Sequence, residues 1–171
     1  CRRVVQLVEN RVVSIEAVRR QRVYFASPRG IFSTATKDLL QDEMISMAGA
    51  VNVAHHLKGY FREISPEQFI EWNPDLVLLS GHRHHGSHDT LEQPQFAAVS
   101  AVAHGRIYRF PSNIAHWDFP SPLSALGILW LAATCYPEKF TDLDMAAEID
   151  RFHMTLFGKR FADLGGKLET R

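Results

Sequence analysis

The sequence has little cysteine. Cys1 and Cys135 are the only two among 171 residues, and they lie far apart in the chain. They provide no pair with the spacing of a zinc site or of a redox dithiol. Cys135 stands in an apolar helical stretch, where a packed thiol is the expected role.

A long hydrophobic run and an excess of charge are also missing. The longest apolar stretch, Ala125 to Ala133, is about half of the roughly 20 residues that a membrane crossing needs. Lys and Arg together number 19 and so do Asp and Glu, so no net field favours nucleic acid or an acidic membrane as a partner. No basic start followed by an apolar stretch marks a signal peptide. A chain that begins at Cys1 without Met is expected to be a mature form or a fragment.

The chain does contain the composition of a folded domain and an alternation of strands and helices. Apolar residues make up 46% and charged residues 22%, which predicts a core of ordinary size. Dense apolar segments predict strands at 22–26, 75–80 and 106–110. Helical spacing and caps predict helices at 2–20, 36–48, 65–73, 122–136 and 144–157. This order indicates an α/β fold with a mostly parallel sheet covered on both faces.

The candidate binding residues lie in the loops that come after the predicted strands. Ligands of open α/β sheets bind outside the carboxyl ends of strands. The loops at 27–32, 81–89 and 111–118, joined by the loop at 52–63, carry cations, imidazoles and aromatic rings suited to a large, flat or anionic ligand. The predicted ligand contacts are Arg29, Phe32, Tyr60, Phe61, His82, Arg83, His116 and Trp117.

Several residues of these loops also have a simpler explanation. His82, His84 and His85 can ligate a metal, or can belong to a solvated loop, since no carboxylate or Cys stands at fixed helical spacing to complete a coordination shell. Arg29 and Arg83 can be solvated cations, and Trp117 can anchor a loop. Only the convergence of these loops at one sheet edge favours a binding function.

Seven short motifs occur in an order and spacing that resemble one protein family. They are Val23–Ala26, Gly30–Ser33, Ala48–Val53, Ser65–Gln68, Trp72–Val77, Ala101-Val102 with Gly105–Tyr108, and Gly127–Ala132 followed by Tyr136-Pro137-Glu138. Over about residues 22–158 the chain resembles the C-terminal lobe of periplasmic binding proteins that feed ABC importers of iron-siderophore, haem and cobalamin.

The resemblance implies a three-layer α/β/α lobe at 22–171, preceded at 1–21 by the end of the helix that joins two lobes. It implies a missing N-terminal lobe, a periplasmic or membrane-anchored location, no catalysis and no intrinsic cofactor. The leading ligand is a ferric siderophore or similar metal chelate, and molybdate, haem and cobalamin are alternatives. An isolated lobe would expose an apolar face, which favours self-association.

The resemblance also implies that Glu67, in the first turn of a predicted helix, docks the lobe onto the permease. A carboxylate at this position is equally well explained by the helix dipole. Two other functions compete with the receptor interpretation. One is a metal-dependent hydrolase built on the His-rich loop, for which Asp89 and Asp118 are the nearby acids. The other, a dinucleotide-binding domain, lacks the glycine-rich turn after the first strand.

Overall fold

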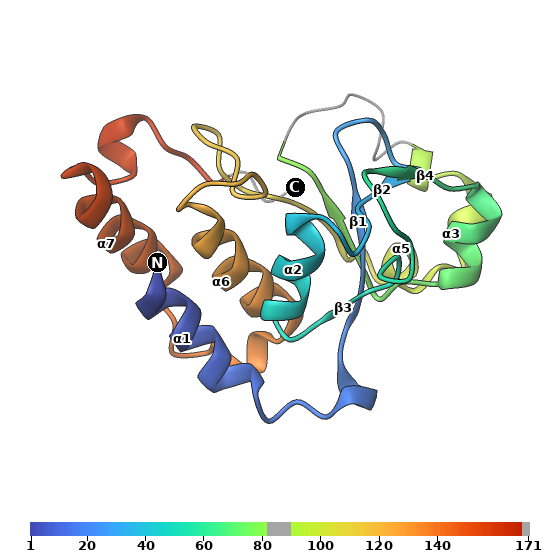
Figure 1. The fold of residues 1–171 in the computed structure, drawn as a ribbon, viewed down its shortest axis with the longest axis horizontal. Coiled ribbons are helices and arrows are strands. Elements are labelled where there is room, and N and C mark those ends of the chain that lie inside the picture. Colours follow the sequence, from blue (N-terminus) through green and yellow to red (C-terminus); the bar gives the residue numbers. More distant parts are fainter. Residues whose placement is uncertain (82–89, 169–171) are drawn as a thin grey trace.

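A twisted sheet forms the centre of the molecule in the computed structural model, which describes residues 1–81 and 90–168 (Figure 1). Strand order is β4-β2-β1-β5-β6, with β3 paired to β1. The strands are β1 (Arg22–Ala26), β2 (Ser33–Thr34), β3 (Val51–Asn52), β4 (Arg62–Glu63), β5 (Leu76–Leu79) and β6 (Ile107–Arg109).

The long strands run parallel, as predicted. Ala26 of β1 lies opposite Leu79 of β5, and Leu79 lies opposite Arg109 of β6. The loops after these three strands therefore leave the sheet at the same edge. The strands β2 and β4 are antiparallel additions that the sequence did not predict, because two residues are too few to show a period.

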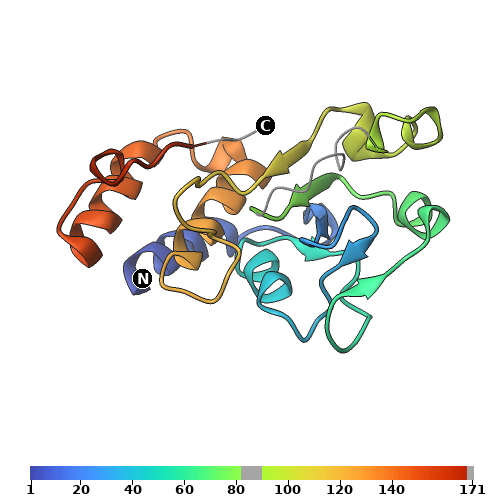
Figure 2. The ribbon, with the colours of Figure 1, turned by 90° about the horizontal axis from the view of Figure 1, so that it is seen from above.

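Helices cover both faces of the sheet (Figures 1 and 2). On one face lie α1 (Arg2–Val12), α2 (Leu40–Met47), α6 (Ser124–Cys135) and α7 (Met145–Phe157). On the other lie α3 (Pro66–Trp72) and α5 (Ser100–Ala103), with short 3-10 turns at Ala17–Arg19, Pro94–Phe96, Pro137–Lys139 and Ala162–Leu164 elsewhere in the chain. This confirms the predicted three-layer α/β/α class.

Alternation along β1 divides the core into two clusters. Val23 and Phe25 point into the cluster that contains α1, α2 and α6. Tyr24 and Ala26 point into the other cluster, which contains Phe69 of α3. Both faces of β1 are therefore buried, as the uniformly apolar sequence of a central parallel strand requires.

Two predicted helices are shorter than their sequence pattern indicates. The helix predicted at 2–20 ends at Val12, and the chain then runs through Ile15, which is buried, to extended backbone at Glu16. Val18, which continues the apolar spacing of the predicted helix, is exposed, and so is Val13. The helix predicted at 36–48 begins at Leu40, because the Thr36 hydroxyl bonds to the Gly59 carbonyl and holds a turn before α2.

A buried hydroxyl is among the groups that hold the linker after α1 to the lobe. Tyr136 Oη accepts a hydrogen bond from the Gln21 amide (2.9 Å) and donates one to the Gly49 carbonyl (2.8 Å). The domain boundary at residue 21 stays a prediction.

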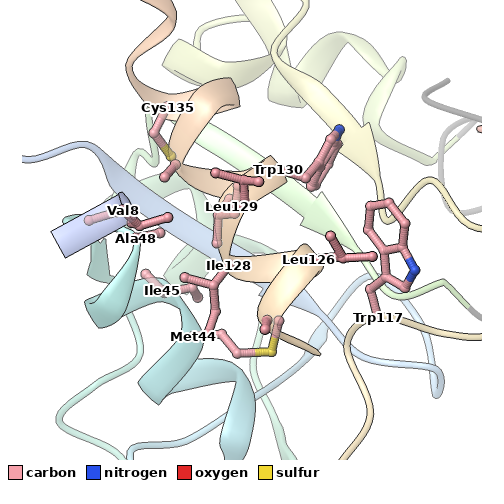
Figure 3. Close-up of a cluster of buried hydrophobic side chains, with 14 of the residues drawn as sticks. Val8, Met44, Ile45, Ala48, Trp117, Leu126, Ile128, Leu129, Trp130 and Cys135 are labelled. Carbon is pink, nitrogen blue, oxygen red and sulfur yellow. The ribbon is translucent and has the colours of Figure 1, made fainter. Parts of the chain in front are cut away.

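The helix α6 is apolar on all sides because it is buried between the sheet and its helical neighbours (Figure 3). Cys135 is buried there as predicted, and burial raises the pKa of its thiol to about 12. In the described ranges, 1–81 and 90–168, no helix combines the length and the apolar character that a bilayer crossing requires.

Candidate functional site

The loop after β1 holds Arg29 at the carboxyl edge of the sheet. Gly30 has φ of +138°, a backbone conformation that L side chains rarely adopt, and the Ser27 and Ser33 backbones close the loop with a 2.7 Å hydrogen bond. The buried Tyr24 hydroxyl donates to the Ile31 carbonyl at 2.6 Å. Burial raises the pKa of Tyr24, so its hydroxyl keeps its proton and its hydrogen bond to Ile31 holds the loop against the core.

Arg29 lies over two aromatic rings from a segment about thirty residues away in the chain. Its guanidinium carbon is 5.5 Å from the ring centroid of Tyr60 and 5.9 Å from that of Phe61. The structure therefore brings together three of the predicted site residues. Arg29 and Tyr60 are exposed and Phe61 is half-buried, so the cation–π contacts orient the guanidinium while leaving it open to solvent. No ion pair of Arg29 with a carboxylate occurs within residues 1–81 and 90–168.

The neighbouring strand β5 ends in a second polar group. Ser80 Oγ donates to Asp118 Oδ2 at 2.6 Å, and the Gly81 amide donates to the same oxygen at 3.2 Å. Asp118 is fully buried, and its carbonyl accepts a 2.8 Å hydrogen bond from the Gln41 amide group. This carboxylate joins the end of β5 to the loop after β6.

A pocket of about 330 Å³ opens beside this group, between the ends of β5 and β6. Its lining includes Gly81, Arg109, Asn113 and His116. His116 is half-buried, and the Arg109 guanidinium donates to the Ser80 carbonyl at 3.0 Å. The predicted residue His116 therefore lines a pocket at the expected sheet edge, and Arg109 lines the same pocket.

A buried polar network supports the start of α2. Asp42 Oδ1 accepts from Asn52 Nδ2 at 2.8 Å, and Asp42 Oδ2 lies 2.9 Å from His55 Nδ1. Asn52 also donates to the Ala35 carbonyl and accepts from the Ala54 amide, so its side chain joins the backbone after β2 to the backbone after β3. This network fixes the beginning of the segment that carries Tyr60 and Phe61.

Trp117 does not belong to the binding surface, and its prediction as a ligand contact is wrong. Its side chain is fully buried and lies in the core beside Leu126 of α6 (Figure 3). Gly127 permits this packing, because a Cβ there would stand 2.8 Å from the Trp117 carbonyl oxygen. The alternative interpretation of Trp117 as a loop anchor is the one that the structure supports.

Phe32 is also directed toward the core rather than exposed. It is half-buried, and its ring contacts Phe96 at 5.8 Å and Phe69 at 6.4 Å between centroids. A ligand could reach only the remaining exposed part of this ring. Its role as a contact stays a prediction.

The predicted contacts His82 and Arg83 and the metal-ligand candidates His84 and His85 fall outside the described residues, and so does Asp89. These assignments remain predictions. Within the described ranges there is no group of three or more His, Cys, Asp or Glu side chains that could hold a metal ion.

Glu67 is exposed in the first turn of α3. Ser65 caps this helix, as predicted, by accepting from the Gln68 amide at 3.2 Å. The pKa of Glu67 is lowered, first by a hydrogen bond from its own backbone amide and then by the Ser65 side chain. These contacts are enough to account for a carboxylate at this position of the helix. The docking of Glu67 to a permease stays a prediction.

Three features of this sheet edge were not predicted from the sequence. Nothing in the sequence marked Arg109 as a site residue beyond its place in a predicted strand, and nothing marked Asn113. Asp118 is recognisable in the sequence only as a nearby acid. Its role as a buried link requires knowing that the loop after β6 returns to the end of β5.

Comparisons with known proteins identify the family of this chain. The family model described as periplasmic binding protein matches residues 2–114. The molybdate-binding protein MolA of Haemophilus influenzae is 28% identical over 154 residues, which is 89% of this chain and 43% of that relative. The chain belongs to the periplasmic binding protein family.

Solved structures show the same fold. The structure of MolA bound to molybdate, the periplasmic binding protein of an ABC transporter, matches with a TM-score of 0.79 at 27% identity, covering 91% of this chain and 48% of that one. A periplasmic solute binding protein from Veillonella parvula gives 0.81 at 21% identity, with 98% and 52% covered. The Helicobacter pylori protein CeuE, in complex with Ni-His, gives 0.82 at 18% identity, with 96% and 52% covered. The chain thus spans about half the length of these relatives.

Proposed function

We propose that this chain is the C-terminal lobe of an ABC-importer receptor that captures a compact metal oxoanion of the molybdate class. The observation that carries the proposal is the Arg29 guanidinium, held over Tyr60 and Phe61 at the carboxyl edge of the sheet and open to solvent. Such a cation offers several N–H donors to oxoanion oxygens. The likeness to MolA supports this ligand class.

The rest of the proposed receptor rests on membership of the family. The ligand is enclosed between this lobe and a second one, and the protein acts outside the cytoplasmic membrane, free or anchored. Glu67 meets the permease. None of these steps is catalytic, and both MolA and the Veillonella parvula relative are named as binding proteins.

One observation favours a second ligand class, the ferric siderophore or another metal chelate. The Tyr60 side chain is 61% exposed, and an exposed ring of this size suits a ligand with carbon surface of its own. A compact oxoanion would use Arg29 and leave most of the Tyr60 ring uncovered. Haem and cobalamin belong to the same larger class.

Calorimetric titration of the full-length protein tests both ligand classes. Molybdate, sulfate and a ferric siderophore are titrated in turn into the wild type and into three variants. Arg29→Gln should weaken molybdate binding at least tenfold, because hydrogen bonds to charged groups are worth about 1.5–3 kcal/mol. Arg2→Gln, at an exposed arginine of α1, is the matched control and should bind as the wild type does.

Tyr60→Ala separates the two classes. It should reduce affinity for a siderophore and leave molybdate affinity within about twofold. Molybdate binding that is the same in Arg29→Gln and in the wild type would contradict the proposed site. If a siderophore binds to saturation and molybdate does not bind, the ligand class is the metal chelate and not the oxoanion.

A further inference from the structure

Two side chains of the turn before α2 hold Gly59, the residue that comes directly before the two rings of the binding edge. The Gly59 amide donates to Asp38 Oδ2 at 2.7 Å, and the Gly59 carbonyl accepts from the Thr36 hydroxyl. A third hydrogen bond, from the Lys37 amide to the Leu57 carbonyl at 3.3 Å, joins the same two segments. Thr36 and Asp38 therefore form a clamp on the backbone of Gly59.

Gly59 depends on this clamp because its own backbone is little restricted. Its φ is +95°, which L side chains rarely adopt, and a Cβ there would stand 3.3 Å from a guanidinium nitrogen of Arg62. Glycine suits such a turn, but glycine also has more conformational freedom to lose on folding than any other residue. Side-chain hydrogen bonds to both of its polar backbone groups supply the restraint that a side chain of its own would give.

The other end of the ring segment is fixed as well. Immediately after the two rings, Arg62 of β4 lies opposite Thr34 of β2 in the sheet. The ring of Phe61 is also stacked on Phe25 of β1, with 6.5 Å between centroids. Tyr60 and Phe61 are therefore the only residues between the clamp and the sheet.

The stretch at 33–38 also fixes the loop that carries Arg29. The Ser33 carbonyl accepts a 2.7 Å hydrogen bond from the Ser27 amide, at the base of that loop. One short stretch of chain is thus bonded to the loop of the cation at its beginning and to the ring segment at its end. The Arg29 guanidinium carbon, 5.5 Å from the ring centroid of Tyr60, and the ring beneath it share this support.

We propose that Thr36 and Asp38 are positioning residues of the ligand site. By holding the chain before the two rings, they keep those rings under the Arg29 guanidinium in the free protein. A cation that is already ordered loses less freedom when it binds, so affinity rises without any new contact to the ligand. The effect on affinity rests on the proposed function, because it requires a ligand at Arg29. The effect on the position of the guanidinium does not.

Two other roles of Asp38 would give different results. In a purely structural role, its removal lowers stability and leaves the Arg29 guanidinium in place. In an electrostatic role, its negative charge repels an anionic ligand, and every neutral replacement strengthens binding. Asp38→Asn separates these roles from positioning, because it removes the charge and keeps an oxygen that accepts from the Gly59 amide, whereas Asp38→Ala removes both.

The first measurement is the NMR signal of the Arg29 Nε–H proton in the nitrogen-labelled full-length protein at mildly acidic pH. Arg29→Gln identifies the signal by its loss. In the wild type the ring currents beneath the guanidinium should shift it upfield. Asp38→Ala should move it toward the position of a free arginine, and Asp38→Asn should restore most of the shift. A signal that Asp38→Ala leaves unchanged, or that both variants displace equally, would overturn the proposal.

Asp142→Ala is the matched control for this measurement. Asp142 is also an exposed carboxylate that accepts hydrogen bonds, from the Arg11 guanidinium at 2.7 and 2.9 Å, and it lies away from the binding edge. Its removal should leave the Arg29 signal and the ligand affinity unchanged. A displacement as large as that in Asp38→Ala would mean that the signal reports general loosening, against the proposal.

The second measurement is a double-mutant cycle by calorimetry, with molybdate as the probe. Asp38→Ala should weaken binding about three- to tenfold, as expected for one long side chain that must now be ordered on binding. In the Arg29→Gln background the same change should have no further effect. Equal weakening in both backgrounds would show that Asp38 acts without Arg29 and would overturn the proposal. Tighter binding by Asp38→Ala and Asp38→Asn alike would assign Asp38 the electrostatic role instead.

Thr36→Val serves where Asp38→Ala does not fold. Thr36 is fully buried, and valine keeps its shape but leaves the Gly59 carbonyl without the hydroxyl donor. The Arg29 signal should move as it does in Asp38→Ala, while Thr36→Ser, which keeps the hydroxyl, should retain the wild-type position. An unmoved signal in Thr36→Val would contradict the proposal. If the wild type binds neither molybdate nor a siderophore, the proposed function fails, and the Arg29 signal still decides whether the clamp positions the guanidinium.

Discussion

The loops at 52–63 and 111–118 look alike in sequence and differ in the structure. Each lies beside the proposed binding edge and carries an aromatic residue among polar neighbours, Tyr60 in the first and Trp117 in the second. Tyr60 is 61% exposed beneath the Arg29 guanidinium, whereas Trp117 is fully buried against α6. The two rings differ in burial because the element that follows each loop differs in polarity. Trp117 precedes the most apolar helix of the described chain, and Tyr60 precedes Arg62 and Glu63 of an exposed short strand.

The strongest test of this contrast is removal of each ring. Trp117→Ala should lower the free energy of unfolding by about 3–5 kcal/mol, because the cavity opens inside a packed core. Tyr60→Ala, the matched control, should cost less than about 0.5 kcal/mol. Urea denaturation of both variants measures the two losses. Similar losses would contradict the assignment of one ring to the core and the other to the surface.

Phe61 is intermediate between the buried Trp117 and the exposed Tyr60, so its removal should reduce both stability and ligand affinity. Its half-buried ring is stacked on Phe25 on the core side, with 6.5 Å between centroids, and meets Tyr60 edge-to-face at 4.9 Å. Phe61→Ala should cost about 2 kcal/mol of stability, roughly half of a full aromatic truncation. Ligand affinity should also fall, since Arg29 loses one of its supporting rings. Loss of stability with unchanged affinity would place Phe61 in the core alone.

Glu67 extends the contrast to a surface residue with a proposed partner. Charge reversal by Glu67→Arg in the full-length protein should reduce ligand uptake by whole cells several-fold, because a pair across the permease interface becomes a repulsion. Ligand affinity of the purified variant should not change. Glu67→Gln serves as the milder variant, with a small loss of helix stability. Normal uptake with Glu67→Arg would contradict docking through Glu67, and the helix dipole would then be the only explanation for a carboxylate at this position.

The smallest effect is expected at Asp142, an exposed carboxylate away from the binding edge. The Arg11 guanidinium holds both of its oxygens, at 2.7 and 2.9 Å, and this hydrogen bonding lowers the pKa of Asp142. A lowered pKa stabilises the fold above the unfolded value of about 3.9, and this contribution disappears as the pH falls through the folded value. The stability difference between the wild type and Asp142→Asn should therefore shrink below about pH 4. A difference independent of pH would contradict this.

The α/β class and the three parallel strands β1, β5 and β6 could be predicted from the sequence, because apolar strands and capped helices leave strong local patterns. The strand at 22–26, the Ser65 cap and the buried Cys135 are examples. Contacts between residues far apart in the sequence could not be predicted. Nothing local shows that Asp118 reaches the end of β5, or that Arg29 lies over a ring some thirty residues away. Gly127, a glycine inside an apolar helix, was the available signal that a loop packs closely there and that Trp117 is buried.

The most direct test of the central claim is a crystal structure of the full-length protein soaked in molybdate, with the molybdenum located by anomalous scattering. The proposed site predicts a peak at the carboxyl edge of the sheet, with oxoanion oxygens within hydrogen-bond distance of the Arg29 guanidinium. A molybdenum peak away from Arg29, or no peak at saturating molybdate, would contradict the proposal that this lobe binds a compact oxoanion there.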